Sequence, residues 1–302
     1  MRVSSLISLA EELKIKYSEN ESMALHTSFK IGGKADIYLK PETAEQLTRL
    51  ITFLGENEIP FFVLGSGSNL IVSDKGIEGA VVDTTALNKI YLKDDNCIYA
   101  EAGASLAALC CFARDNSLTG LEFAYGIPGS VGGALYMNAG AYGGDMSCVV
   151  TSADSITVKG QKVSRCAEKL ELGYRKSVFK KNGEIIIGAC FKLNKSSREE
   201  IGSKMDEIIA KRKNSQPLEY PSAGSTFKRP EGYYAAALID ECELKGRAVG
   251  GAKVSEKHAG FVINFDKATC EDVIGLVEVI KDTVKEKKGV DLETEIIFVG
   301  RQ

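Results

Sequence analysis

The chain has 302 residues, of which 44% are hydrophobic and 26% charged, as is typical of a globular protein long enough for two domains. The formal net charge is −3, with Lys and Arg scattered, so no nucleic-acid surface is predicted. No apolar run approaches the roughly 20 residues that cross a bilayer, and Glu11, Glu12 and Lys14 lie where a signal peptide would be apolar. We therefore expect a cytoplasmic protein with no membrane partner, whose first residues form an amphipathic helix.

Strands alternate with helices in the first third of the chain. The hydrophobic pattern predicts a helix from Pro41 to about Glu56, and strands ending at Leu39 and covering 60–64, 70–72 and 79–83. The resulting β-α-β-loop-β unit places residues 65–69 at a strand end, where α/β folds bind ligands.

The middle third of the chain predicts a second group of strands and helices, and the last third predicts a separate domain. We expect strands at 97–100, 149–158 and 184–193, a helix at 105–116, and a long glycine-rich loop at 126–144. A polar break at 196–200 precedes a helix at about 198–213, a loop at 220–232, strands near 248–253 and 260–264, a helix at 270–288 and a last strand at 292–299. The predicted fold class is α+β, with one domain at 1–197 in two parts, about 1–87 and 88–197, and another at 198–302.

Cysteine and histidine limit the possible chemistry. The eight cysteines show no Cys-x-x-Cys pair and no regular spacing, which predicts buried free thiols rather than disulfides or zinc. Only His26 and His258 are present, so a multi-histidine metal site is excluded, no metal is expected, and a Ser-His-Asp hydrolase is disfavoured.

Two glycine-rich loops are the main candidates for a ligand site. Gly65-Ser66-Gly67-Ser68-Asn69 alone favours a simple strand-to-strand turn, and it matches neither a Walker loop nor a Rossmann fingerprint. The segment Gly126 to Gly144, however, has seven glycines in nineteen residues. Successive exposed N–H groups in such loops bind anions, so the pair predicts a large ligand with phosphates.

Three further stretches carry polar groups. In Pro221 to Pro230, Gly224 allows the Ser225 hydroxyl to reach the surface beside the cations Lys228 and Arg229, which suits an anionic substrate but also a plain solvated loop. Glu293 and Glu295 alternate on one face of the last predicted strand, and Glu295 adjoins its apolar half, where burial raises a carboxyl pKa; a solvated pair is the alternative. Arg175 alone reads as surface charge.

The chain resembles the UDP-N-acetylenolpyruvoylglucosamine reductase family nearly from end to end. The resemblance rests on separate motifs in order: H-T-S-F-K-I-G-G-K-A from His26, G-S-G-S-N, I-P-G-S-V-G-G-A-L-Y-M-N-A-G-A-Y-G, Tyr174-Arg175, A-G-S-T-F-K-R-P, K-H-A-G-F and L-E-T-E. It implies an FAD-binding domain of the vanillyl-alcohol-oxidase type in two α+β subdomains, followed by a substrate-binding α+β domain. It also implies reduction of UDP-N-acetylglucosamine enolpyruvate to UDP-N-acetylmuramate with NADPH, a step of peptidoglycan precursor synthesis.

The resemblance also implies roles for individual residues. Ser225 is expected to donate a proton, and Arg175 and Glu295 to stabilise charge around the substrate carboxylate. The residues expected to bind FAD are Gly65, Ser66, Gly67, Ser68, Asn69, Gly126, Ile127, Pro128, Gly129, Ser130, Gly133, Asn138, Ala139 and Gly140. Those expected to contact substrate are Tyr174, Lys228, Arg229 and His258. No protein partner is indicated.

Departures from the family pattern qualify two details. Ser68 stands where related oxidases carry the histidine that attaches flavin, so FAD is expected to be noncovalent. Ile297 stands where members commonly carry an arginine, so that contact is missing or replaced here. Arg229, where other members carry asparagine, and the compact length indicate the shorter class of the family. An oxidase of the same fold and a noncatalytic nucleotide-binding protein remain alternatives.

Overall fold

The computed structural model describes residues 2–301 and divides into two compact units. The first unit comprises residues up to 19, 37–66 and 79–211, and the second comprises 20–36, 67–78 and those from 212 onward. Helices and strands are mixed in both units, which confirms the α+β class.

A four-stranded sheet carries the first glycine loop. Its strand order is β1-β2-β5-β3, with β1 (Lys16–Ser22), β2 (Lys34–Lys40), β5 (Ile77–Asp83) and β3 (Phe61–Leu64). β3 and β5 are parallel, so their carboxyl ends meet at one edge of the sheet. The helices α1 (Arg2–Glu12) and α2 (Ala44–Glu56) precede β1 and β3. α2 begins with a capping box between Thr43 and Gln46, and it buries the leucine and isoleucine side chains that the sequence spacing predicts to face inward.

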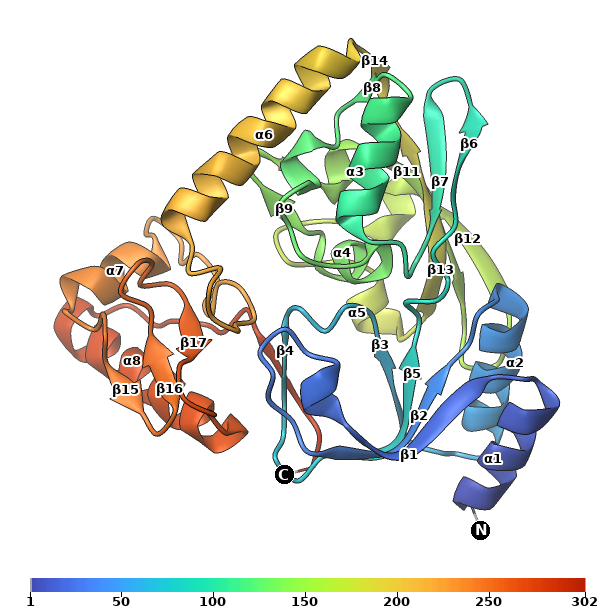
Figure 1. Ribbon diagram of the computed structural model, residues 1–302, viewed down its shortest axis with the longest axis horizontal. Helices are drawn as coiled ribbons and strands as arrows, with labels where there is room; N and C mark the ends of the chain where they lie inside the picture. Colours follow the sequence, from blue (N-terminus) through green and yellow to red (C-terminus); the bar gives the residue numbers. More distant parts are fainter. Residues whose placement is uncertain (1, 302) are drawn as a thin grey trace. The chain divides into compact units, whose positions relative to one another are not determined.

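A five-stranded antiparallel sheet forms the rest of the first unit (Figure 1). Its order is β12-β11-β13-β7-β6, with β12 (Lys162–Cys166), β11 (Val150–Ile156), β13 (Ile185–Lys192), β7 (Cys97–Glu101) and β6 (Ile90–Asp94). β13 is buried from Ile185 to Phe191, as expected of a central strand covered on both faces.

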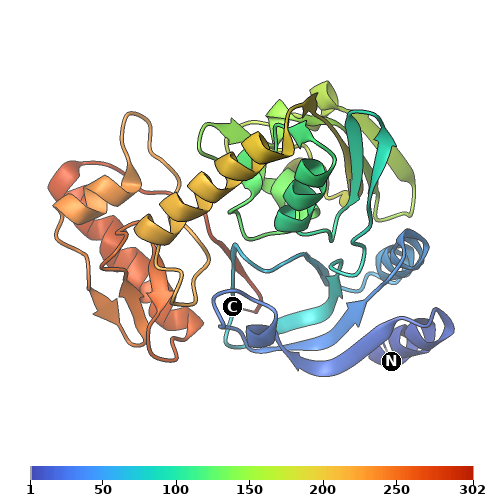
Figure 2. The ribbon, with the colours of Figure 1, turned by 45° about the horizontal axis from the view of Figure 1, so that its top comes forward.

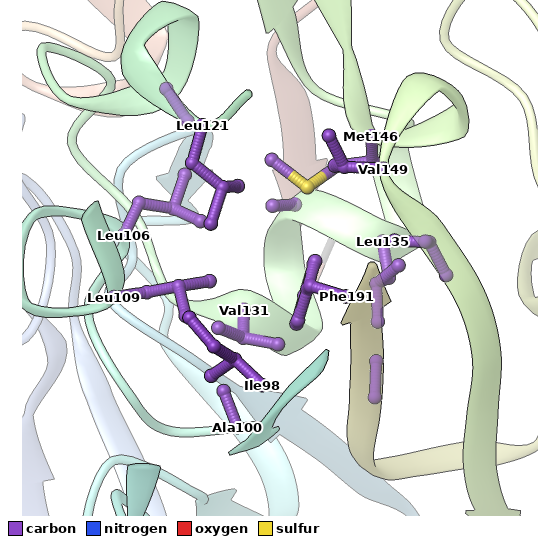
Figure 3. Close-up of a cluster of buried hydrophobic side chains, with 14 of the residues drawn as sticks. Ile98, Ala100, Leu106, Leu109, Leu121, Val131, Leu135, Met146, Val149 and Phe191 are labelled. Atoms are coloured by element: carbon purple, nitrogen blue, oxygen red, sulfur yellow. The ribbon is translucent and has the colours of Figure 1, made fainter. Parts of the chain in front are cut away.

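The helices α3 (Leu106–Asp115) and α4 (Val131–Met137) pack against one face of this sheet and close a hydrophobic core. Figure 3 shows Phe191 of β13 and Ile98 of β7 among the leucine and valine side chains of these helices. The fully buried side chains of Leu106 and Leu109 come from α3. This core fixes the backbone that leads into and out of the second glycine-rich segment.

Short elements complete the first unit. Two short strand pairs are β8 (Leu118–Thr119) with β14 (Asn194–Lys195) and β9 (Gly140–Ala141) with β10 (Gly144–Asp145). The short helices are η2 (Glu122–Ala124), η3 (Met146–Cys148), η4 (Ala167–Leu170) and α5 (Phe179–Asn182). The longer helix α6 (Arg198–Ser215) continues into the second unit.

The second unit is built on two small sheets. β4 (Leu70–Val72) runs parallel to β18 (Ile297–Val299), and β15 (Ala248–Val249), β16 (Ala252–Val254) and β17 (Val262–Asn264) form an antiparallel sheet. The helices α7 (Ala235–Glu241) and α8 (Cys270–Lys288) pack together, and α8 also contacts β15 and β16 (Figure 2). The short helix η1 (Met23–Leu25) also lies in this unit. The Asp74 carboxylate accepts hydrogen bonds from the Cys270 and Glu271 amides, at 3.0 and 3.2 Å, and so anchors the start of α8.

Two sequence-based assignments are wrong in detail. Residues 126–144 are not a continuous loop, because α4 forms within them despite Gly132 and Gly133 in its first turn. The buried Val131 and Leu135 supply the packing that outweighs glycine's poor helix propensity. The last strand begins only at Ile297 rather than at residue 292.

The eight cysteines are all free thiols, as the sequence predicts, but they are not all buried. Cys148 and Cys166 are exposed, and Cys111 is half-buried. Within residues 2–301 no group of Cys, His, Asp and Glu has the arrangement of a metal site. None of the described helices is both long enough and apolar enough to span a membrane.

Candidate functional site

The first glycine loop starts at the carboxyl end of β3, beside the end of β5. Leu64 and Asp83 are partners in that parallel pair, and Gly65 follows Leu64 directly. A Cβ atom built on Gly65 would lie 2.4 Å from the Ser130 hydroxyl oxygen. Only glycine therefore allows this loop to approach the second glycine-rich segment so closely. The fold of the first unit thus brings together two loops that the sequence predicts to share a ligand.

Several amide groups in these two loops lack a protein acceptor. Across residues 2–301, no hydrogen bond is donated by the backbone N–H groups of Gly65, Ser66, Gly67, Gly126, Gly129 and Ser130. Consecutive unpaired amides after a strand are the groups that bind phosphate oxygens. FAD contains a diphosphate, so the residues present fit this cofactor.

Other amides of the second segment hold the fold together. Val131 and Gly132 donate hydrogen bonds to the carbonyls of Ala104 and Ala102, at 2.9 and 2.8 Å. The Ser130 hydroxyl caps α4 by accepting from the Gly133 amide at 3.3 Å. These groups are therefore not available to a ligand, and the expected row of free amides is limited to the residues before α4.

The remaining predicted cofactor residues of this segment have packing roles. The side chains of Ile127 and Ala139 pack against the core of the first unit. Gly140 pairs with Asp145 in the β9–β10 hairpin, where a Cβ atom on the glycine would lie 2.5 Å from that of Asp145. Pro128 lies in the connection between η2 and α4.

Tyr174 and Arg175 occupy the corner of a tight turn in the first unit. Gly173 and Lys176 exchange two backbone hydrogen bonds, at 3.1 and 3.0 Å, and so close the turn. Arg175 has a φ of 53°, in the left-handed region that non-glycine residues seldom adopt. Its carbonyl accepts a hydrogen bond from the Lys180 ammonium at 3.0 Å, and its guanidinium carbon lies 5.1 Å from the centre of the Tyr174 ring. The turn holds the arginine in one backbone conformation.

Asn138 connects this turn to the glycine-rich segment. It is 1% exposed and ends α4 with a φ of 43°. Its side-chain amide donates to the Gly173 carbonyl at 3.0 Å, and its oxygen accepts from the Ser147 amide at 3.1 Å. The sequence predicts Asn138 as a cofactor contact, and in the structure its side chain also positions the turn that carries Arg175.

Ser225 lies on an irregular ladder in the second unit. Its neighbour Thr226 donates its amide to the Gly260 carbonyl at 2.8 Å, and its hydroxyl accepts from the Val262 amide at 3.0 Å. Ser225 itself is exposed, whereas Thr226 is 1% exposed. The preceding Gly224 has a φ of 78° with open space around it. The backbone is therefore held firmly while the Ser225 hydroxyl faces outward.

Glu295 lies beside this ladder. Its amide donates to the Thr226 carbonyl at 2.9 Å, and its carbonyl accepts from the Asn69 side chain at 3.1 Å. Phe227 and Thr294 form a single bridge, so 293–295 is extended but is not part of a regular strand. Glu295 is half-buried and Glu293 is exposed, as the sequence analysis expects. Asn69, which the sequence predicts as a cofactor contact, therefore fixes the backbone of Glu295.

The three predicted substrate contacts of the second unit already have protein partners. The Lys228 ammonium pairs with the Glu293 carboxylate. The Arg229 guanidinium carbon lies 3.9 Å from the centre of the Tyr234 ring, and its Nε donates to the Tyr233 carbonyl at 3.3 Å. His258 accepts a hydrogen bond at Nδ1 from the Gly260 amide at 3.1 Å.

The environment of His258 keeps its ring neutral. Burial lowers the pKa of His258, with a smaller contribution in the same direction from Lys245. Because Nδ1 accepts a hydrogen bond, the neutral ring carries its proton on Nε2. The Gly260 carbonyl accepts from Thr226, so this histidine lies next to the segment that carries Ser225.

The first unit thus carries a glycine-lined cradle with unpaired amides, and the second unit carries an exposed hydroxyl on a fixed backbone. Residues 35–165 match the profile of an FAD binding domain, which places the chain in the class of flavin-binding proteins. Residues 216–299 match the C-terminal domain of UDP-N-acetylenolpyruvoylglucosamine reductase. The fold class expected from the sequence is confirmed by these two matches.

Individual relatives agree with both profiles. The UDP-N-acetylenolpyruvoylglucosamine reductase of Clostridium novyi is 49% identical over 297 residues, covering 98% of this chain and 96% of the relative. That of Clostridium tetani is 49% identical over 93% of this chain and 91% of its own. The crystal structure of the reductase from Thermus caldophilus superposes with a TM-score of 0.80 at 35% identity, covering 94% of this chain and 98% of that one. The chain belongs to the UDP-N-acetylenolpyruvoylglucosamine reductase family.

Proposed function

We propose that this protein reduces UDP-N-acetylglucosamine enolpyruvate to UDP-N-acetylmuramate with NADPH, in the cytoplasm, as a step of peptidoglycan precursor synthesis. The observation that carries the proposal is the 49% identity to named reductases over nearly the whole chain. The glycine cradle and the exposed Ser225 hydroxyl support it. The substrate is a small molecule, and no protein partner enters the reaction.

We propose that residues 1–197 form the FAD-binding domain and residues 198–302 the substrate-binding domain. FAD bound there would supply the hydride-transfer chemistry between NADPH and the enolpyruvyl carbon. The unpaired amides of Gly65 to Gly67 and of Gly126, Gly129 and Ser130 would hold the cofactor diphosphate. Ser68 offers no ring nitrogen for covalent attachment, so binding is noncovalent.

Ser225 is the proposed proton donor. Hydride addition at C3 of the enolpyruvyl group leaves a carbanion at C2, which must be protonated. A serine hydroxyl is a weak acid, but a carbanion is basic enough to take its proton. The hydroxyl is also neutral, so it adds no negative charge next to the substrate carboxylate. The exposure of Ser225, on a backbone fixed by the hydrogen bonds of Thr226, supports this role.

Arg175 and Glu295 are proposed to act on the charge that develops at the substrate carboxylate. A guanidinium stabilises such charge most when it is already in place before the reaction. The left-handed Arg175 backbone, held within a closed turn, provides that preorganisation. Glu295 can assist only by donating a hydrogen bond, which requires the protonated carboxyl. Its backbone is fixed at both its amide and its carbonyl.

Tyr174, Lys228, Arg229 and His258 are proposed substrate contacts. Lys228 pairs with Glu293, which is on the surface, so substrate phosphate can replace that carboxylate at little cost in free energy. His258 is neutral and carries its proton on Nε2, so it can donate a hydrogen bond without adding charge.

The flavin spectrum of the purified protein under anaerobic conditions tests this function. NADPH should bleach the flavin absorbance, and UDP-N-acetylglucosamine enolpyruvate should restore it. Bleaching without restoration by that substrate, together with rapid reaction of the reduced protein with oxygen, would refute the reductase assignment in favour of an oxidase. Absence of flavin, with no binding of added FAD, would instead indicate a noncatalytic protein.

The Ser225→Ala variant tests the proton donor. Bleaching by NADPH should stay near the wild-type rate, whereas restoration by substrate should slow by about 10²–10⁴-fold, the usual contribution of a general acid. Ser222→Ala is the matched control, because Ser222 lies in the same loop and bonds through its backbone. Wild-type rates in both half-reactions of Ser225→Ala would show that another group donates the proton.

A further inference from the structure

Ser28 is hydrogen-bonded to two loops of the second unit at once. Its backbone amide donates to the Gly67 carbonyl at 3.1 Å, and its hydroxyl donates to the Ser222 carbonyl at 2.6 Å. Gly67 belongs to the first glycine loop, and Ser222 precedes Ser225 in the loop that carries it. All four residues lie in the second unit. One residue therefore joins a loop proposed to bind the cofactor to the loop proposed to donate the proton.

The segment around Ser28 packs directly on the glycine loop. A Cβ atom built on Gly67, whose φ is 60°, would lie 2.1 Å from the His26 carbonyl oxygen and 3.1 Å from the Cα atom of Thr27. These distances leave no room for a side chain at Gly67, so the two backbones are in contact. This contact and the hydrogen bond from the Ser28 amide together fix the Gly67 carbonyl.

Ser28 itself is held on a rigid backbone. Its neighbours Thr27 and Phe29 are 2% and 1% exposed, and Phe29 belongs to the hydrophobic core of the second unit. The Thr27 hydroxyl donates to the Ile31 carbonyl at 3.0 Å. The Phe29 carbonyl accepts a hydrogen bond from the Asn264 side chain at 3.1 Å. The Ser28 hydroxyl therefore approaches its acceptor from a fixed support.

The loop that carries Ser225 has few hydrogen bonds of its own. Across residues 2–301, the amides of Gly224 and Ser225 donate no hydrogen bond. The position of Ser225 therefore depends on the residues held on either side of it. After it comes Thr226, whose amide and hydroxyl are both bonded. Before it comes Ser222, which forms a bridge with Ile263 and accepts the hydroxyl from the neighbouring segment.

We propose that Ser28 is a positioning residue for proton donation, because its hydroxyl fixes the loop of Ser225 relative to Gly67. This inference rests on the roles proposed for Ser225 and for the first glycine loop. A proton donor must lie within hydrogen-bond reach of the atom that it protonates, and an error of about 1 Å costs up to ~100-fold in rate. The bridge between Ser222 and Ile263 remains when the hydroxyl is removed, so the expected effect is smaller than this limit.

The Ser28→Ala variant of the FAD-loaded protein tests this role, because it removes the hydroxyl and keeps the amide that bonds to Gly67. Bleaching by NADPH should stay near the wild-type rate, and restoration by UDP-N-acetylglucosamine enolpyruvate should slow about 10-fold. Ser28→Thr keeps a hydroxyl and should recover most of the rate. Thr283→Ala is the matched control, because it removes a hydroxyl-to-carbonyl bond of 2.7 Å within α8 and should leave both half-reactions unchanged. Wild-type restoration in Ser28→Ala, or equal slowing of both half-reactions, would overturn the proposal.

A double variant shows whether Ser28 acts through Ser225. If it does, adding Ser28→Ala to Ser225→Ala should slow restoration by less than about twofold, because the group that was positioned is already absent. A further loss of about 10-fold in that background would refute the positioning role. The same data separate this inference from the proposed function. If the substrate does not restore the flavin of the wild-type protein, both fail together, whereas an effect of Ser225→Ala without one of Ser28→Ala rejects only the role of Ser28.

Discussion

Replacing Asn138 by alanine should destabilise the first unit and loosen the turn that carries Arg175. The substitution removes hydrogen bonds to the Gly173 carbonyl and the Ser147 amide in a site that is 1% exposed. Losing the bond to the Gly173 carbonyl costs about 1–1.5 kcal/mol. Losing the bond to the Ser147 amide costs about 0.5 kcal/mol or less, because Ser147 is exposed and its amide also donates to the Asp145 carboxylate at 2.9 Å. Alanine at a φ of 43° adds about 1 kcal/mol of backbone strain. We therefore expect the free energy of unfolding to fall by about 2–3 kcal/mol.

Urea unfolding followed by far-UV circular dichroism measures this loss, since the chain has no tryptophan. Asn138→Gly is the matched control, because glycine accepts the left-handed conformation but also lacks the side-chain hydrogen bonds. It should recover about 1 kcal/mol relative to alanine. A loss below about 1 kcal/mol in Asn138→Ala, less than the Gly173 bond and the backbone strain together should cost, would refute the reasoning.

The same variant should affect the two half-reactions differently. Asn138 holds the carbonyl of Gly173, which precedes Tyr174 and Arg175. In the flavin assay we therefore expect slower restoration by the enolpyruvyl substrate, with bleaching by NADPH little changed. An equal slowing of both half-reactions would indicate a general loss of structure rather than a misplaced Arg175.

Two other substitutions test the cradle and the buried histidine. Gly65→Ala would place a Cβ atom 2.4 Å from the Ser130 hydroxyl oxygen. The affinity for FAD, measured by titration of the apoprotein, should therefore fall at least ~10-fold. Gly202→Ala in α6 is the control and should bind FAD normally, because a Cβ atom there meets only the end of the Arg114 side chain at 3.9 Å. Burial lowers the pKa of His258 in the folded protein below the value of about 6.5 that it has in the unfolded chain. As the pH falls through 6.5, the unfolded chain therefore binds more protons than the folded protein, and the free energy of unfolding should fall. His258→Gln should remove this part of the slope between pH 7.5 and pH 5.5 in urea midpoints, and an unchanged slope would show that other groups cause it.

Local patterns predict most elements of this fold because each depends on nearby residues. α2 and α8 carry capping boxes and apolar residues at helical spacing, and both are found where these signals place them. α4 escapes prediction because its glycines oppose a helix and only the packing of Val131 and Leu135 stabilises one. The prediction of a strand from residue 292 is wrong for a related reason. Residues 293–295 are alternating and strand-like, but the register that pairs them with 226–228 depends on a segment some seventy residues away.

The candidate site shows the same division between local and long-range information. The residue types around Gly65, Ser225 and Glu295 mark them as candidates, while the roles predicted for them come from the family resemblance. The two asparagines are not marked in this way, since Asn69 and Asn138 lie in glycine-rich motifs where a cofactor contact is the natural expectation. Their side-chain amides donate to the carbonyls of Glu295 and Gly173, residues distant in sequence from each asparagine, and no local pattern indicates this.

These two hydrogen bonds mean that each glycine-rich segment also positions a residue proposed to act on the substrate. In the first unit, the segment that offers amides to a diphosphate also fixes the turn bearing Arg175 through Asn138. In the second, Asn69 fixes the backbone of Glu295, whose amide in turn bonds to the neighbour of Ser225. An asparagine suits this work, because one short side chain both donates and accepts, and it tolerates the left-handed backbone that Asn138 adopts. Substituting either asparagine should therefore alter the chemistry of a residue that it does not precede or follow in the chain, while the glycine amides that we propose to bind the cofactor stay in place.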